Sequence, residues 1–302
     1  MANPINTGLW GKLLFPGVNK WYGDEYGDYK TEYTEIFEVE KSSKAYEEDI
    51  SVSSFGLPVQ TGEGQAVTFD STQQGFLDRY THVTYTLGFV ITKELVEDDQ
   101  YDRVGRMKAQ ALARSMRHGK EINAANILNR ATTSGYTYGD GVVLLSASHP
   151  NVSGGTWSNL LATAADLSEA ALEQAWVDIA KYTDDRGLRI AVKTNKLIVP
   201  VDSAIEAAKI MGTEYEVGTN NNTINVARTK YPGGLVVNHF LTDTDAWFVK
   251  TDVKNGLKLI ERVADQFTMD DEFTTDNAMF KARARYSVGA SDKRGIYGTM
   301  GA

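Results

Sequence analysis

The stretch TKELVEDDQYDRVGRMKAQALARSMRHGKEINAANILNRA, residues 92–131, decides the interpretation of the whole chain. Alanine, leucine, methionine, lysine, arginine, glutamate and glutamine dominate it, and no proline interrupts it, so a helix is predicted. A turn or a break in this helix is possible near residues 98–100. The apolar stripe of the expected helix consists of Tyr101, Val104, Met107, Ala111, Leu112, Met116, Ile122 and Leu128. One long amphipathic helix is the natural interpretation.

Five cations lie off the apolar stripe of this helix: Arg103, Arg106, Arg114, Arg117 and Lys120. A solvated helix face is the ordinary explanation of such a set. The alternative is that these cations meet acidic groups of a neighbouring copy of the chain. The four arginines are therefore candidate assembly contacts.

The segment before the helix, residues 46–91, has the pattern of strands around a glycine-rich centre. Its part from Val83 to Phe89 alternates between apolar and polar side chains, which is the period of a strand. A long hairpin is predicted. Its tip, PVQTGEGQAVTFD at residues 58–70, carries few large apolar groups, so it could hardly fold alone and is expected to lie on a neighbouring copy. The candidate contacts of this tip are Val59, Gly62, Gly64 and Phe69.

Residues 1–45 are rich in glycine, tyrosine and glutamate, and no sustained period precedes a short strand that is expected at residues 34–39. This segment is predicted to be an extended arm. Its Trp10, Phe15 and Trp21 side chains need an apolar surface, which either a neighbouring copy or the same subunit could supply. All three are candidate assembly contacts.

The segment after the long helix mixes strands and helices. Residues 132–159 are predicted to be a loop with one short strand at residues 142–145. A helix is expected to begin at Ser168 and to end by Gly187, and a second one to run from residue 202 or 203 to about residue 211. Strands are expected at residues 196–201, 234–238 and 245–250, and in LKLIERV, QFTMDDEF and MFKARARYSVGASDKRGIYG. The predicted fold class is α+β.

Composition limits the range of functions. The chain of 302 residues has a formal net charge of -9, the wrong sign for a protein that grips nucleic acid through a basic surface. It has no cysteine, which excludes disulfides, thiolate nucleophiles and cysteine-based metal sites. No secretory leader or membrane-spanning apolar run is found, so the protein is expected to be made in the cytoplasm.

The residues that carry chemistry do not form a known catalytic pattern. The four histidines lack metal-ligand spacing, and the glycine-rich stretches match no phosphate-binding loop. Ser146 and His149 lie three residues apart, but the strand-turn-helix setting of a hydrolase nucleophile is missing. The acidic runs at residues 97–99 and 270–272 could chelate a divalent cation, although a solvated face or an intersubunit ion pair is the commoner explanation. No catalytic, cofactor-binding or metal-binding residue is predicted.

Three stretches, in this order along the chain, resemble a known family. The first is LLSASHPNVSGGTWSN at residues 144–159, with His-Pro, Gly-Gly-Thr and Ser-Asn before a helix. The second is LVVNHFLTDTDAWFVKTD at residues 235–252, and the third is the aromatic and arginine-rich DNAMFKARARYSVGASDKRGIYG at residues 276–298. Together they are similar to major capsid proteins of tailed bacteriophages with the HK97-type fold, in the branch of Mu-like head subunits.

The resemblance implies an architecture. Residues 1–45 would be an N-terminal arm, 46–91 an extended E-loop, and 92–131 the spine helix of a P-domain. Residues 132–250 would form a mixed α/β A-domain, and 251–302 the closing strands of the P-domain. No lysine occurs between Lys44 and Lys93, so the crosslinking by an E-loop lysine that some members use is not expected.

The resemblance also implies a function. The chain would be a structural protein, not an enzyme, which self-assembles into pentamers and hexamers of an icosahedral virion shell around double-stranded DNA. It would enclose the DNA without sequence-specific binding, and the helix arginines could face the genome. A separate scaffolding protein, a portal and cement proteins are the expected partners, with no membrane and no cofactor, and assembly would take place in the cytoplasm of the host bacterium. The alternatives are an encapsulin-like nanocompartment shell and, from another class, a hydrolase that uses Ser146 and His149.

Overall fold

The computed structural model describes residues 8–28, 30–97, 101–215, 224–271 and 277–302, and within these ranges it is an α+β protein. The helices are α1 (Gly8–Asp28), α2 (Tyr33–Ile36), α3 (Lys93–Glu97), α4 (Tyr101–Asn129), α5 (Glu169–Ala180), α6 (Ala204–Gly212) and α7 (Ala227–Lys230). The strands are β1 (Glu38–Lys41), β2 (Tyr46–Val52), β3 (Gln74–Thr81), β4 (Val83–Ile91), β5 (His149–Pro150), β6 (Thr156–Trp157), β7 (Thr194–Val199), β8 (Gly234–Val237), β9 (Trp247–Thr251), β10 (Leu257–Asp271), β11 (Ala278–Ala290) and β12 (Ile296–Thr299).

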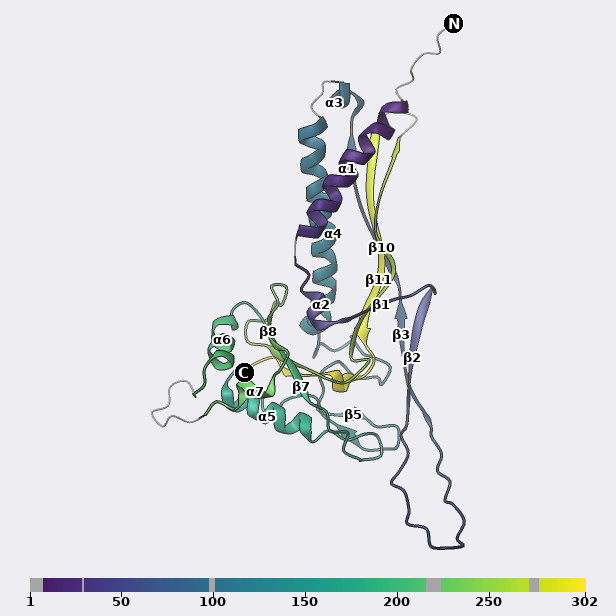
Figure 1. The fold of residues 1–302 in the computed structure, drawn as a ribbon, viewed down its shortest axis with the longest axis vertical. Helices are drawn as coiled ribbons and strands as arrows, with labels where there is room; N and C mark the ends of the chain where they lie inside the picture. Colours follow the sequence, from purple (N-terminus) through teal and green to yellow (C-terminus); the bar gives the residue numbers. More distant parts are fainter. Residues whose placement is uncertain (1–7, 29, 98–100, 216–223, 272–276) are drawn as a thin grey trace.

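A four-stranded sheet in the order β1-β10-β11-β4 forms the elongated body, and α4 runs along it with α1 beside it (Figure 1). The segments LKLIERV and QFTMDDEF were predicted as two strands, but their described residues, 257–271, form one strand, β10. Its pairing with β11 shifts register between Glu261 and Val263 and again between Val263 and Gln266. Such bulges interrupt the two-residue alternation, which is why the sequence pattern indicated a break.

A second sheet, in the order β12-β9-β7-β8, forms a separate body together with α5, α6 and α7. Strand β12 comes from the C-terminal end of the chain, so the prediction that residues 251–302 all stay with the first sheet is wrong. Ser168 accepts a hydrogen bond from the Ala171 amide and begins α5, as predicted. That helix ends at Ala180, before Gly187, which lies in a later turn with a φ of 81°.

One apolar cluster joins the two bodies. It contains side chains from α2, the end of α4, both sheets and the segment after α4. Leu144 and Leu145 belong to it and are 1% and 2% exposed, but their backbone forms no strand. The strand predicted at residues 142–145 is therefore wrong, because a short buried apolar pair has the same sequence signal whether or not its backbone pairs.

The N-terminal segment differs most from its prediction. Residues 8–28 are helical, whereas an extended arm was expected. Val18, Trp21 and Tyr22 follow the spacing of one helix face, and this face packs on α4 and β10. The ring of Tyr22 stacks on Phe267 of β10 at a centroid distance of 4.8 Å. The same subunit therefore supplies the apolar surface for this part of the arm.

Helix α4 was predicted correctly as an element, but its buried face was not. Met107 and Ile122, which were assigned to the apolar stripe, are 61% and 45% exposed. Small residues such as Ala109 and Ala113 are fully buried instead. Small side chains let the helix approach the sheet and α1 closely, so the buried face is narrower and less apolar than periodicity indicated. The possible break at residues 98–100 lies outside the described residues.

Candidate assembly surface

The hairpin formed by β2 and β3 projects away from both bodies (Figure 1). The prediction placed β4 in the same loop, but β4 pairs with β11 along its whole length, so the hairpin ends at Thr81. The two strands pair from Tyr46 to Val52 and from Gln74 to Thr81. The residues between them, 53–73, form no strand and are called the tip loop below.

Buried polar contacts fix the base of the hairpin to the body. Asp78 of β3 accepts a hydrogen bond from Lys293 at 2.5 Å, and both side chains are at most 10% exposed. Asp49 of β2 pairs with Lys258 of β10 at 2.8 Å. Burial opposes ionisation of Asp49, but the hydrogen bonds from Lys258 and Ser291 and the Lys258 charge together outweigh it and lower the pKa of this carboxyl. The base is therefore a rigid mount for the tip loop.

A turn of the second body holds both legs of the tip loop. Ser54 donates a hydrogen bond to Asp184 at 2.5 Å, and its amide donates to Asp185 at 3.2 Å. On the other leg, Arg186 pairs with Asp70 at 3.4 Å and donates to the Ser71 carbonyl at 2.8 Å. Residues 184–186, called the clamp, set the direction in which the tip loop leaves the molecule.

Beyond the clamp, the tip loop has apolar side chains that its own subunit does not cover. The exposed fractions of Phe55, Leu57, Val59, Val67 and Phe69 are 61%, 74%, 68%, 70% and 92%. Large apolar side chains gathered on one projecting segment mark a protein interaction surface. Sequence analysis named Val59 and Phe69 as candidate contacts and did not name the other three; both are exposed, and their contact with a neighbouring copy stays a prediction.

The glycines Gly62 and Gly64 lie at the turn of the tip loop, as predicted. The backbone amide of Gln65 donates a hydrogen bond to the Gly62 carbonyl at 3.2 Å. Gly64 has a φ of 81°, a backbone conformation that suits glycine. Their contact with a neighbouring copy stays a prediction.

The candidate contacts on the arm have mixed outcomes. The side chains of Trp10 and Phe15 lie outside the described residues. Trp21 is half-buried and packs against the cluster that contains Ile91 and Phe280 of its own chain. Side chains of the same subunit therefore already cover much of the Trp21 surface that was predicted to contact a neighbouring copy.

The arginines of α4 divide into two groups. Arg103 and Arg106 are exposed, and Arg114 is exposed beside Glu25 of α1 at 2.9 Å. Arg117 is only 5% exposed and donates to the Tyr26 carbonyl. The prediction that Arg117 contacts a neighbour is wrong, because α1 covers it. Sequence reasoning could not detect this, since the helical form of residues 8–28 was itself missed.

The geometry around His149 excludes it as the base of a hydrolase. His149 is completely buried, with Nδ1 2.7 Å from Asp140 and Nε2 3.1 Å from the Asn159 carboxamide oxygen. Its second ring nitrogen thus faces Asn159, not Ser146. Burial of Asp140 opposes its ionisation, but the hydrogen bond to His149, the Lys293 charge and the hydrogen bond from the Val142 amide together outweigh burial and lower the pKa of Asp140. The hydrogen bonds among Asp140, His149 and Asn159 therefore join the segments before and after the strand pair β5–β6 to it.

Within the described ranges, no three His, Asp or Glu side chains gather in a way that could hold a metal ion. The acidic runs at residues 97–99 and 270–272 lie partly outside these ranges. In the part of the chain that the structure describes, no helix combines the length and the apolar character that a membrane crossing requires.

A long helix on a long sheet, a second α/β body and a projecting hairpin define the HK97-like class of capsid subunit. The phage capsid protein family matches residues 77–299, and the chain belongs to this family. The α+β class, the HK97-like fold and the resemblance to phage capsid proteins are thus confirmed. No curated protein matches the chain.

Solved structures share the fold at low identity. The procapsid protein of bacteriophage JBD30 has a TM-score of 0.52 and 17% identity, over 98% of this chain and 76% of that one. The capsid protein of a native GTA particle has a TM-score of 0.55 and 15% identity, over 90% and 91%. The virus-like particle from Pyrococcus furiosus has a TM-score of 0.54 and 12% identity, over 95% and 99%.

Removing the clamp arginine is expected to loosen the tip loop. In an Arg186→Ala variant, hydrogen exchange of the amides in residues 53–57 and 70–73 should become about tenfold faster at neutral pH, because the ion pair and the bond to Ser71 are lost. Hydrogen exchange with mass spectrometry would measure this. Arg189→Ala, which removes an exposed arginine three residues later, is the control. Equal exchange in both variants would contradict a clamp.

Low pH is also expected to loosen the tip loop. Hydrogen bonds from the Gly56 and Ser71 amides and the nearby Arg186 charge hold the pKa of Asp70 below its ordinary value of 3.8. The closed clamp thus binds fewer protons than the open one, so its stabilisation is complete above pH 3.8 and decreases as the pH falls through the lowered pKa. Exchange rates of residues 53–57, corrected for the intrinsic pH dependence, should rise there in the native chain and rise less in Asp70→Asn, in which only Asp184, whose pKa is also lowered, still links this leg to the pH.

Proposed function

We propose that this capsid protein is the major head subunit of a tailed phage, and that it self-assembles into pentamers and hexamers of an icosahedral shell around double-stranded DNA. One observation carries the proposal most directly. The tip loop holds five large apolar side chains between 61% and 92% exposed, on a segment that is rigidly mounted and directed away from its own subunit. Copies of the chain can cover these groups.

The energetic argument follows from burial. Fully burying one such side chain contributes about 1.5–3 kcal/mol, and each subunit can bury several of them on its neighbours. In a closed shell every contact is repeated many times, so modest contacts sum to a stable particle. The same subunit must fit both pentamers and hexamers, so the contact surfaces of neighbouring copies must meet in slightly different settings.

The parts of the fold are assigned accordingly. We assign residues 1–45 to the N-terminal arm, the hairpin of residues 46–81 to the E-loop, and α4 to the spine of the P-domain. Residues 132–250 with β12 form the A-domain, and β4, β10 and β11 complete the P-domain. The net charge of -9 favours enclosure of DNA without sequence-specific binding.

The proposed partners follow from the resemblance to phage head subunits. They are a separate scaffolding protein, a portal and cement proteins, and the proposed place of assembly is the host cytoplasm. The nanocompartment alternative shares the fold, but the match to the phage capsid family favours the virion shell.

Electron microscopy of the purified protein tests the proposal. Negative-stain images and sedimentation velocity, recorded over a range of concentrations, should show ring-shaped capsomers or closed icosahedral particles. A compact monomer at every concentration, with or without added crowding agent, would rule out self-assembly. A mass measurement of intact particles gives the number of subunits in each shell.

A further inference from the structure

The strand β4 lies at one edge of the first sheet, next to β11. It pairs with β11 over its full length of nine residues, and no other strand of the described residues pairs with it. Apart from this pairing, the Lys108 ammonium donates to the Val90 carbonyl at 3.3 Å. A long edge strand presents a row of backbone N–H and C=O groups with which another chain can pair. The edge of β4 is therefore a candidate docking site for an extended segment.

A column of cations runs along the face of the sheet that points away from α4. Buried and outward residues alternate along β11, and the buried Ala282 belongs to an apolar cluster with α4. The outward residues Lys281, Arg283 and Arg285, called the cationic column, follow one another at intervals of about 7 Å. Among the residues that the structure describes, no carboxylate lies within ion-pair distance of the cationic column. An acidic partner would therefore meet three positive charges at regular intervals.

The β4 residues beside the cationic column are small. Gly88, Thr86 and Thr84 pair with the three cations in the register of β4 and β11. A further strand beyond β4 would lie about 10 Å from β11, which is two strand spacings. A glutamate and a lysine or arginine side chain can together span that distance, because no bulky side chain of β4 stands between them. Carboxylates on an added strand can thus reach the cationic column.

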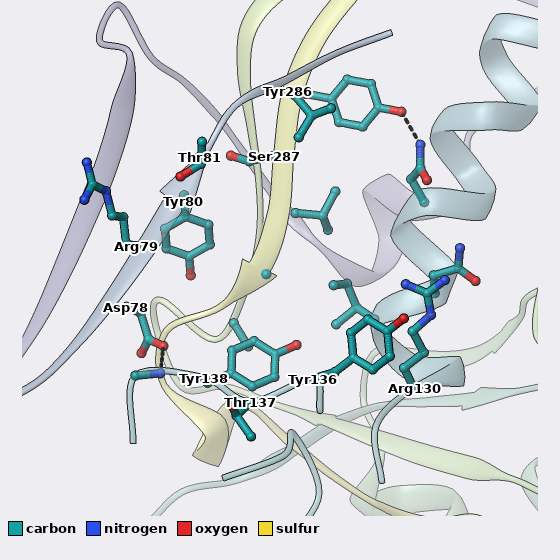
Figure 2. A pocket seen from close by; sticks show the side chains of 18 of the residues that line it. Asp78, Arg79, Tyr80, Thr81, Arg130, Tyr136, Thr137, Tyr138, Tyr286 and Ser287 are labelled. Carbon is teal, nitrogen blue, oxygen red and sulfur yellow. Dashed lines mark hydrogen bonds between the residues drawn. The ribbon is translucent and has the colours of Figure 1, made fainter. Parts of the chain in front are cut away.

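The other face of the same edge is apolar. Val83 and Leu87 lie on the α4 side of β4 and are 50% and 47% exposed. At the Val83 end, a cavity of about 590 Å³ opens beside the hairpin base, between β3, β4, the second half of α4, residues 136–139 and β11 (Figure 2). An added strand would cover Val83 and Leu87 and could place an apolar side chain at the mouth of this cavity. Five tyrosines line the cavity: Tyr80, Tyr85, Tyr136, Tyr138 and Tyr286.

The edge of β4 thus fits a strand that is acidic on one face and apolar on the other. Two segments of the chain come near to this description, and neither fits. The strand β1 alternates Glu38, Val39 and Glu40, but it is already paired with β10. The tip loop contains a single charged residue, Glu63, between residues 55 and 69. The occupant is therefore assigned to another protein.

We propose that the free edge of β4 receives an extended segment of a partner protein, which pairs as an added strand. Its acidic side chains point to the cationic column and its apolar side chains to Val83 and Leu87. In this mode of recognition, main-chain hydrogen bonds supply affinity and alternate side chains supply specificity. Nucleic acid could meet the cations, but it has no apolar side chains for the other face. That the partner belongs to the shell rests on the proposed function, whereas binding to the subunit needs no shell.

Binding of a short peptide to the purified chain tests the site. The probe is a fluorescein-labelled peptide of nine residues in which glutamate alternates with valine. Fluorescence polarisation should show binding to the native chain and at least tenfold weaker binding to Lys281→Glu with Arg283→Glu, because like charges then face each other. Arg103→Glu with Arg106→Glu makes the same charge change at exposed positions of α4 and should bind like the native chain. No binding to the native chain, or equal weakening in both variants, would overturn the proposal.

Hydrogen exchange locates the bound peptide. Saturating peptide should slow the exchange of amides in residues 83–90 at least tenfold, since an added strand bonds to the outer backbone groups of β4. The amides of residues 53–73 in the tip loop should not change. Both charge-reversed positions are exposed, so thermal unfolding of that variant should match the native chain. Binding of the peptide without protection of β4 would overturn strand pairing.

Two further probes separate the occupants by their chemistry. A peptide with serine in place of valine keeps the carboxylates and should bind at least tenfold more weakly, because it buries no apolar side chain. Single-stranded oligothymidylate of equal charge should also bind more weakly. If oligothymidylate bound as tightly as the first peptide and lost affinity on charge reversal, the face would be a nucleic-acid surface and the proposal would be wrong. A native chain that binds the peptide but forms no particles would support this site and count against the proposed function.

Discussion

A chain that lacks residues 59–69 is expected to fold normally and to lose the ability to form closed shells. The deletion removes three exposed apolar side chains and leaves Asp70, so the bonds of Asp70 to Arg186 and to the Gly56 amide can persist. If burial on neighbours contributes about 1.5–3 kcal/mol for each side chain, every contact loses enough to lower its association constant by several orders of magnitude. Electron microscopy and sedimentation of the variant, beside the native chain, measure the loss.

The deletion both shortens the loop and removes apolar side chains. Two variants that keep the length of the chain separate these two causes of lost assembly. Leu57→Ser with Phe69→Ser keeps every backbone atom and removes apolar surface, so it should also fail to form particles. Gln60→Ala with Thr61→Ala changes neighbouring polar residues and should assemble normally. If the deletion variant forms intact particles of native stability, the tip loop is dispensable. Burial of its apolar side chains on neighbouring copies would then not be what holds the shell together.

Replacing Asp78 by alanine is expected to destabilise the subunit itself by about 3–5 kcal/mol, because it leaves the buried Lys293 ammonium without its partner. Asp78 accepts hydrogen bonds from Lys293 at 2.5 Å and from the Gly139 amide at 2.7 Å, and both bonds are lost. Urea unfolding, followed by tryptophan fluorescence, gives the change in the free energy of unfolding.

The same substitution at an exposed position is the control. Asp202→Ala, at an exposed aspartate, should change the free energy of unfolding by less than about 0.5 kcal/mol. A double variant, Asp78→Ala with Lys293→Met, should recover much of the lost stability, since no buried charge remains. A loss below about 1 kcal/mol in Asp78→Ala would mean that water reaches Lys293 and that the hairpin base is less rigid than proposed.

The sequence predicted the elements whose signals are local. Helix α4 has good helix formers over its whole length, and Ser168 begins α5 through its own side chain. The strand β7 is a short apolar run before a proline. In each case, neighbouring residues along the chain determine the backbone conformation, so no distant contact had to be known.

Helix α1 shows where local signals are insufficient. Gly17, Gly23 and Gly27 lower the helix propensity of residues 8–28, and the apolar face is formed by only a few aromatic residues. Packing against α4 and β10 supplies the stability that propensity does not. The same packing covers Arg117, so one missed helix produced two wrong predictions.

The assembly surface could be predicted only in outline. Exposure of Val59 and Phe69 follows from a glycine-rich segment with few large apolar groups, which cannot form its own core. The clamp joins residues more than a hundred positions apart, and the cavity beside the hairpin base combines residues of β3, β4, α4 and β11. Such sites have no local signal, because their members converge only when the chain folds.

By itself, the sequence determined the α+β class, the order of most elements, the exposed tip loop and membership in a capsid family through ordered local motifs. Only the tertiary structure decided which strands pair, that β12 returns to the second sheet, that α1 is a helix packed on α4, and that the clamp holds the tip loop while a cavity opens beside the hairpin base. The physical reason is the separation along the chain over which each kind of interaction acts. Propensity, capping and alternation act between residues a few positions apart, whereas sheet order, burial and buried ion pairs depend on contacts between distant segments.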